Sequence, residues 1–141
     1  MSRTNTTLVI LESDREKVEA LIDDMFDEDM SITKDGVALV QYEFFDVTEG
    51  QIEIEKELLD ERIPFNKTIE AYDSNPDITF YVRFDEQGNL IEKAFEHKSK
   101  VFIDIEDVLN AMNDDTVQQL VDHTKVMPWN EQADYCMAYR K

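Results

Sequence analysis

The strongest constraint in this sequence is a concentration of negative charge in its first half. The 50 residues from Glu12 to Glu61 contain 18 acidic and four basic residues, a net charge of −14. The whole chain of 141 residues carries −19, so only −5 falls on the rest. Charge of one sign opposes compaction and keeps a protein in solution. Solubility alone does not require such a concentration, although solubilising acidity remains the simplest alternative.

The remaining composition is that of a folded domain. Hydrophobic residues make up 42% of the chain, which is too apolar for intrinsic disorder. The length suits one domain, so we expect a single acidic domain over residues 1–141. The apolar run at 8–11 (LVIL) is too short for a membrane span or a signal-peptide core. Because Cys136 is the single cysteine, we expect a cytoplasmic protein without an intramolecular disulfide.

Five segments have the composition of β-strands. They are rich in β-branched and aromatic residues, and they span 7–11, 37–47, 66–72, 78–84 and 90–103. Turn residues separate the last three segments, with the stretch DEQGN (85–89) well suited to a hairpin. We therefore expect the middle of the chain to form an antiparallel meander.

Two capping-box patterns predict helices in the acidic half. The pattern S-x-x-E at 13–16 begins a segment with helical periodicity that we expect to run to about Phe26. The pattern T-x-x-Q at 48–51 begins a second helix that ends before Pro64, although the alternation in QIEIE also allows a strand there. An acidic loop is expected after the first helix, closing at Asp35-Gly36.

The last third of the chain combines helical periodicity with a break. Apolar residues at helical spacing follow Asp104 and again follow Asp114, which predicts two helices with these residues inside. The stretch MPWNEQ (127–132) predicts a break before a last helical turn with Tyr135 and Tyr139. The resulting order β-α-β-α-β-β-β-α-α predicts an α+β domain, with helices packed on a mostly antiparallel sheet of about five strands.

The sequence lacks the patterns of an enzyme or a cofactor site. Glycine occurs only at positions 36, 50 and 88, so no phosphate-binding loop of the P-loop or Rossmann kind can form. An EF-hand pattern that begins at Asp27 fails, because Ile32 and Ala38 stand where glycine and glutamate are required. Three further side chains lie at no paired zinc-binding spacing: His97, His123 and Cys136. We expect a non-enzymatic protein with no catalytic residue, metal or cofactor.

Direct binding to nucleic acid is also disfavoured. The aromatic segments 42–45 and 80–84 resemble base-stacking platforms in outline, but such platforms come with basic residues. Arg83 is the only basic residue in the two segments, so core packing is the better interpretation. Nucleic acid and anionic lipid both need cationic groups, and the negative charge of the chain favours a basic partner instead.

Carboxylates recur at helical spacing in both predicted acidic helices. On the first they are Glu16, Glu19, Asp23 and Asp27, followed by Glu28 and Asp29 at its C-terminal end. On the second they are Glu49, Glu53, Glu57 and Glu61, with Asp60 beside them. Like charges four residues apart destabilise a helix by about 0.2–0.5 kcal/mol per pair, so each ladder opposes local stability. We predict that these carboxylates bind a cationic partner.

The two ladders have a charge spacing similar to that of nucleic acid. Stacked helix positions lie about 5–6 Å apart, which is comparable to the spacing of successive phosphates along one strand. In size, charge and ladders, the chain resembles the small acidic DNA-mimic inhibitors of phages and plasmids, the antirestriction and anti-CRISPR proteins. Segment 44–65 also looks like a β-turn-helix-β unit found in small phage- and plasmid-borne proteins.

The resemblance implies a protein that inhibits a defence complex or nuclease by presenting a DNA- or RNA-like carboxylate surface to it. The expected partner is a basic nucleic-acid-binding protein, with no contact to nucleic acid or membrane. Two alternatives stay open from the sequence. One is an immunity protein that uses the same electrostatics against one nuclease toxin. The other is a generic cytoplasmic interaction domain whose acidity is solubilising.

Overall fold

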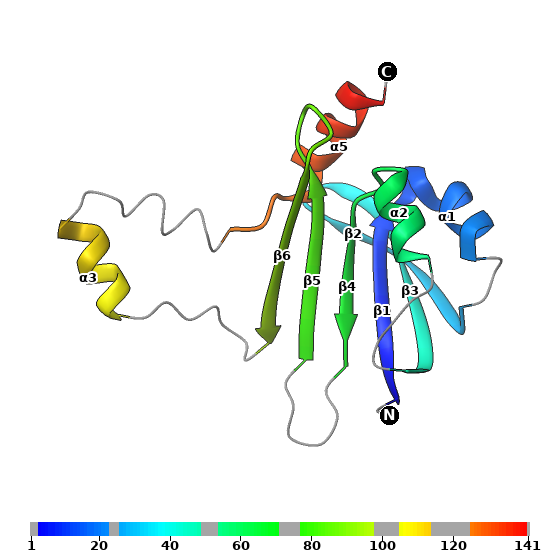
Figure 1. Cartoon of the computed structure of the whole chain (residues 1–141). Coiled ribbons are helices and arrows are strands. Elements are labelled where there is room, and N and C mark those ends of the chain that lie inside the picture. The colour runs from blue at the N-terminus through cyan, green and yellow to red at the C-terminus, as the bar shows by residue number, and fades with distance from the viewer. Residues whose placement is uncertain are drawn as a thin grey trace.

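A six-stranded antiparallel sheet organises the chain (Figure 1). The computed structural model describes residues 3–22, 26–48, 54–70, 77–97, 105–113 and 125–140. The strands are β1 Arg3–Leu11, β2 Glu28–Lys34, β3 Val37–Thr48, β4 Phe65–Ile69, β5 Asp77–Phe84 and β6 Leu90–His97. Their order across the sheet is β2-β3-β1-β4-β5-β6, and each neighbouring pair is antiparallel.

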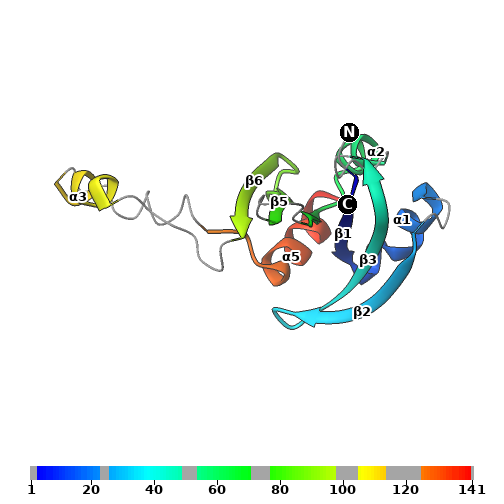
Figure 2. The same ribbon diagram turned by 90° about the horizontal axis from the view of Figure 1, so that it is seen from below.

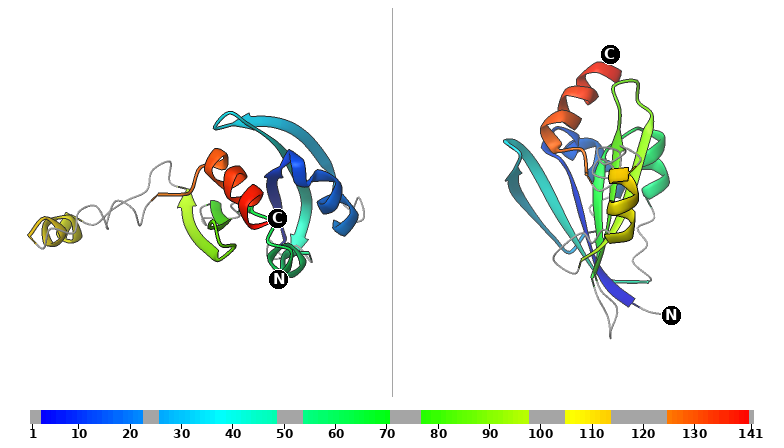
Figure 3. Two further views of the ribbon diagram at one scale, coloured as in Figure 1. Left: turned by 90° about the horizontal axis from the view of Figure 1, so that it is seen from above. Right: turned by 90° about the vertical axis from the view of Figure 1, so that its left-hand side faces the viewer.

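Helices cover both sides of this sheet. They are α1 Arg15–Ile22 after a 3-10 turn at Glu12–Asp14, α2 Glu55–Asp60 and α5 Trp129–Tyr139, whereas α3 Ile105–Asn113 does not cover the sheet (Figure 1). Viewed along the strands, α1 and α2 lie on one side of β1 and α5 lies on the other (Figures 2 and 3). The predicted α+β class and antiparallel sheet are confirmed, as is the meander β4-β5-β6. The sheet has six strands rather than about five.

The additional strand is β2, so the prediction of an acidic loop after the first helix is wrong. β2 pairs with β3 from Glu28 opposite Glu43 to Lys34 opposite Val37. Asp35 and Gly36 have φ angles of 55° and 73°, as a two-residue hairpin turn requires. β2 is an edge strand whose side chains are exposed, except for a half-buried Ile32. β2 therefore lacks the alternation of buried and exposed side chains that indicates a strand.

Both predicted acidic helices are shorter than expected. α1 ends at Ile22, residues 23–25 lie outside the described residues, and Phe26 is not helical. The Phe26 ring packs on Tyr42 of β3, with 4.9 Å between ring centroids, and the chain then enters β2. α2 has six residues, and its expected start at 49–53 lies outside the described part.

The capping box at 13–16 does not begin a helix where it was predicted, and the residues that follow Thr48 in the second box lie outside the described part. Ser13 lies inside the 3-10 turn, whose N-cap is Leu11, and no side-chain hydrogen bond caps that turn. Thr48 is the last residue of β3. The helices are instead held by their apolar side chains, because Val18 of α1 and Leu58 of α2 are fully buried against the sheet.

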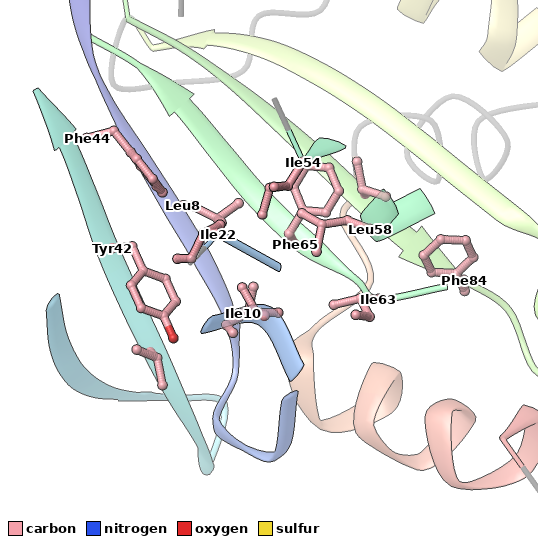
Figure 4. Close-up of a cluster of buried hydrophobic side chains, with 13 residues drawn as sticks. Leu8, Ile10, Ile22, Tyr42, Phe44, Ile54, Leu58, Ile63, Phe65 and Phe84 are labelled. Atoms are coloured by element: carbon pink, nitrogen blue, oxygen red, sulfur yellow. The ribbon is translucent and has the colours of Figure 1, made fainter. Parts of the chain in front are cut away.

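Alternation along the strands divides the core into two clusters. Leu8 and Ile10 of β1 point to the α1/α2 side, where the larger cluster forms (Figure 4). Its other buried members are Val18, Ile22, Val40, Tyr42, Phe44, Ile54, Leu58, Ile63, Phe65, Val82 and Phe84. The cluster on the α5 side contains Leu11, Leu39, Trp129 and Cys136. The burial of Tyr42 and Phe84 confirms that the aromatic strands serve core packing.

α5 is longer than predicted, because the helix starts inside the expected break. Trp129, Gln132 and Cys136 are buried at helical spacing. The Gln132 amide accepts a hydrogen bond from Phe84 N at 2.7 Å and donates one to Phe84 O at 3.0 Å. Asp35 Oδ2, in the β2–β3 turn, accepts one from Trp129 N at 3.0 Å. These bonds fix α5 against both β5 and the hairpin.

α3 confirms the helix expected after Asp104 but not the burial of Ile105, Leu109 and Met112. Ile105, Leu109 and Met112 are 75%, 54% and 62% exposed, and α3 lies apart from the sheet in Figure 1. The helix expected after Asp114 lies outside the described residues.

Candidate functional site: the acidic helix face

α1 and α2 meet on one side of the sheet. Lys17 Nζ of α1 lies 2.5 Å from Oε2 of Glu61, the residue that follows α2. Beneath this contact, Val18 and Leu58 belong to the same buried cluster. We call the carboxylates carried here the acidic helix face: Glu16, Glu19, Asp29, Glu57, Asp60 and Glu61.

Arg15 is the centre of one half of this face. Its guanidinium contacts Glu12 at 3.2 Å, Glu19 at 3.5 Å and Asp29 at 2.8 Å, so one cation is shared by three carboxylates. Desolvation lowers the pKa of Arg15, but the carboxylates of Glu12, Asp29 and Glu19 together raise it above its ordinary value. The group as a whole keeps negative charge.

Two aromatic side chains pack beneath Arg15 and its carboxylates. Tyr42 of β3 is fully buried and packs against the Phe26 ring. Burial, and next the Glu19 carboxylate, raise the pKa of the Tyr42 hydroxyl, which therefore stays neutral below Arg15. Asp29 comes from the edge strand β2, so the group joins a helix to a hairpin across 14 residues of sequence.

In the α2 half of the face, ion pairs engage Glu61 and Glu55. Lys17 contacts Glu61 in an exposed pair, and Lys67 of β4 contacts Glu55 at 2.6 Å from below. Glu16, Glu57 and Asp60 are exposed and form no ion pair with any residue that the structure describes. Their charges are available to a partner without disturbing the fold.

The predicted ladders are only partly reproduced. The ladder from Glu16 to Asp27 is wrong, because α1 ends at Ile22 and Asp27 precedes the edge strand β2. Asp27 Oδ2 instead accepts a hydrogen bond from Phe45 N at 2.6 Å, a structural role at the open end of the hairpin. Glu28 pairs with Glu43 in the β2–β3 register and is exposed.

On the second ladder, Glu57 lies within α2 and Glu61 directly follows it. Three predicted site residues lie outside the described residues: Asp23, Glu49 and Glu53. In the described part, Glu16 and Glu19 lie on α1, and Glu57, Asp60 and Glu61 lie on or directly after α2, so two short helices joined by the Lys17–Glu61 ion pair replace the two long rows.

The role of Arg15 was missed, although its spacing to Glu12 and Glu19 matches the i,i+3 and i,i+4 pairs of a helix. Asp14 was missed as well. It is 4% exposed and accepts hydrogen bonds from Arg140 Nη1 and Nη2 at 2.7 and 3.3 Å. The two residues are 126 positions apart, so no local pattern predicts that pair.

Fold and site together define an acidic α+β domain with a patch of carboxylates on one helical layer. No protein-family model, curated protein or solved structure matches this chain. Within the described ranges, no three His, Cys, Asp or Glu side chains are grouped so that they could hold a metal ion. None of the described helices has the length and apolar character needed to cross a membrane.

Proposed function

We propose that this protein is a non-enzymatic inhibitor that occupies the nucleic-acid-binding surface of a basic partner, such as a defence complex or a nuclease. The observation that carries the proposal is the meeting of α1 and α2 at Lys17 and Glu61. This meeting gathers Glu16, Glu57 and Asp60 on one helical layer. The single buried cysteine fits a reducing compartment, so the proposed site of action is the cytoplasm.

Electrostatics favours a partner rich in lysine and arginine. Carboxylates on a rigid surface form charge-assisted hydrogen bonds with such side chains, in the way that phosphate oxygens do. The net charge of −19 adds long-range steering, so association is fast and weakens as ionic strength rises. The patch is short, which means that it replaces a few phosphates at the centre of a groove rather than a long stretch of duplex.

The proposal is tested with the full chain immobilised and a cell extract passed over it at low salt. Basic nucleic-acid-binding proteins should be retained, and duplex DNA should displace them. The DNA binding or cleavage of each purified partner should then be inhibited by the free chain. Retained proteins that DNA does not displace would contradict the proposal. Retention of one nuclease alone would favour the immunity-protein alternative.

A matched pair of variants locates the binding surface. The test variant carries Glu16→Lys, Glu57→Lys and Asp60→Lys on the acidic helix face. The control carries Glu86→Lys, Glu92→Lys and Asp134→Lys, which are exposed in the β5–β6 turn, in β6 and in α5. Both variants change the net charge equally. We expect the first to lose about tenfold or more in affinity, because each lost charged contact contributes about 1 kcal/mol or more, and the control to lose much less. Equal losses would show that only total charge matters.

A further inference from the structure

A small hollow on the α5 side gathers positive charge in this strongly acidic protein. It lies between β5, β6 and the segment that leads into α5, and its volume is about 260 Å³. Three of the 14 basic residues of the chain line it, namely Arg83, Lys93 and Lys125. Tyr81 and Ile91 supply an aromatic and an aliphatic wall.

Arg83 forms the inner end of the hollow and is only 2% exposed. Its guanidinium lies 4.0 Å from the centre of the Trp129 ring. Nε donates to Met127 O at 3.0 Å, and Nη1 donates to Asn66 Oδ1 at 2.7 Å. Within the described part of the chain, Nη2 donates no hydrogen bond and no carboxylate forms an ion pair with Arg83.

A buried cation of this kind is costly. Burial lowers the pKa of Arg83 to about 10, and Tyr81 and Asp35 oppose this shift only in part. Buried charges in proteins are normally paired, because desolvation without a counter-charge costs several kcal/mol. None of the acidic residues that the structure describes forms an ion pair with this guanidinium.

The mouth of the hollow is also cationic and is held in place. Lys93 Nζ of β6 donates a hydrogen bond to the backbone carbonyl of Lys125, which ties the segment before α5 to the sheet edge. The lining also includes one carboxylate, Glu131. Its Oε1 accepts a hydrogen bond from Tyr135 OH at 2.9 Å, so this carboxylate is engaged by its own helix.

We infer that this hollow binds a small organic anion. Its carboxylate or phosphate group is directed to Arg83 and Lys93, and its flat apolar part lies against Tyr81 and Ile91. The volume is below the 300–1,000 Å³ that is usual for drug-sized ligands, so the occupant is a small molecule of about one ring. The inference does not rest on the proposed inhibitory function, which uses the opposite side of the sheet.

The single tryptophan provides the readout. Trp129 contacts Arg83, so a ligand at Arg83 should change its fluorescence. The full chain is titrated at constant ionic strength with benzoate, phenyl phosphate and the neutral analogue benzamide. We expect a saturable change with at least one of the two anions, and their relative affinities distinguish carboxylate from phosphate. No saturable change with either anion, or an equal one with benzamide, would overturn the inference.

Substitution of a lysine at the mouth avoids disturbing the buried arginine. Lys93→Met should weaken anion binding about tenfold or more, as expected for a lost charged hydrogen bond. Lys34→Met removes an equal charge from exposed β2 and should change the affinity by less than about twofold. Unchanged affinity in the Lys93 variant would refute the assignment. A correctly folded Arg83→Lys variant should also bind less tightly, because the guanidinium fork is lost.

Discussion

The two sides of the sheet differ in how their buried or partly buried arginines are paired. On the α1/α2 side, Arg15 is partly exposed and contacts three carboxylates. On the α5 side, Arg83 is buried against Trp129, and its guanidinium donates hydrogen bonds to backbone carbonyls and to the Asn66 amide oxygen. Arg15 is surrounded by excess acid, whereas Arg83 forms no ion pair with any described carboxylate.

We infer from this difference that the acidity is organised. Among the described residues, Arg83 is buried without forming an ion pair, although the chain is strongly acidic. Carboxylates that form no ion pair with a described residue lie on α1 and α2, and three cations line the hollow beside α5. We expect the first side to attract cationic partners and the second to attract small anions. The predictions below test this division, beginning with the largest effect.

Truncation of Trp129 should have the largest effect on stability. The side chain is 1% exposed, packs in the α5-side cluster and covers Arg83. Trp129→Ala should lower the free energy of unfolding by about 3–5 kcal/mol, the usual cost of deleting a buried aromatic side chain. Urea denaturation followed by circular dichroism measures it. The control Met137→Ala on the same helix, at a position 72% exposed, should change it by at most about 0.5 kcal/mol. A small loss for Trp129→Ala would mean that α5 is not part of the fold's stable core.

Loss of the Gln132 amide should have the next largest effect. Gln132 is fully buried and bonds both backbone groups of Phe84 at the end of β5. Gln132→Ala leaves both groups unpaired, so we expect a loss of about 2–3 kcal/mol in the same denaturation experiment. Exposed Gln87 provides the control, and Gln87→Ala should be close to neutral. Similar effects for the two variants would show that α5 is not anchored through this amide.

Substitution of Asp85 tests whether one acidic residue contributes to stability, in contrast to the acidic residues of the surface. Its carboxylate accepts hydrogen bonds from Gln87 N and Asn89 N at 2.9 Å, and these bonds hold the β5–β6 turn. The Asn89 backbone bond is the main cause that lowers the pKa of Asp85 from 3.8. A lowered folded-state pKa means that the stabilisation is fully present above the unfolded value and is lost as pH falls through the folded value.

Asp85→Ala should therefore be less stable than the parent chain at pH 7, with a difference that shrinks as the pH falls below 3.8. Thermal unfolding across this pH range measures it, and Glu86→Ala in the same turn is the control. A difference independent of pH would show that the loss comes from turn packing and not from the ionised carboxylate.

Substitution of Lys17 should give the smallest change in stability but a clear change in affinity for a basic partner. Its contact with Glu61 is exposed, with 56% and 47% of the two side chains accessible. Such pairs contribute about 0–1 kcal/mol, so Lys17→Met should barely alter unfolding. The same change removes a cation from the centre of the acidic helix face, so affinity for a basic partner should rise. Lys34→Met on β2 is the control, and an equal rise there would indicate a total-charge effect only.

Much of the sheet could be predicted from the sequence, because the interior strands are strongly apolar. β1, β3 and β5 were each expected within a few residues of their bounds. β2 could not be found from hydrophobicity, since Ile32 is the one side chain of that strand that is even half-buried. The Asp-Gly pair before β3 was the available signal, because such a pair favours a two-residue hairpin turn.

The candidate site was harder to predict, because its geometry depends on tertiary contacts. The meeting of α1 with α2 at Lys17 and Glu61 joins residues 44 positions apart, and no periodicity indicates it. Helical spacing also suggested that Asp27 continues the row from Glu16, but packing of Phe26 on Tyr42 ends the helical segment earlier. Arg83 was correctly assigned to a strand that serves core packing. The sequence could not show that no described carboxylate forms an ion pair with Arg83, because this depends on where the other elements pack.

The organisation of charge is tested most directly by mapping where a cation binds. The full chain, labelled with ¹⁵N, is titrated with a short oligolysine peptide at low salt, and amide chemical shifts are followed. We predict saturable shifts concentrated at residues 15–19 and 55–61, with little change along α5, although Glu131 and Asp134 lie there. Shifts spread evenly over the acidic residues of the whole chain would contradict an acidic helix face and would leave solubility as the role of the charge.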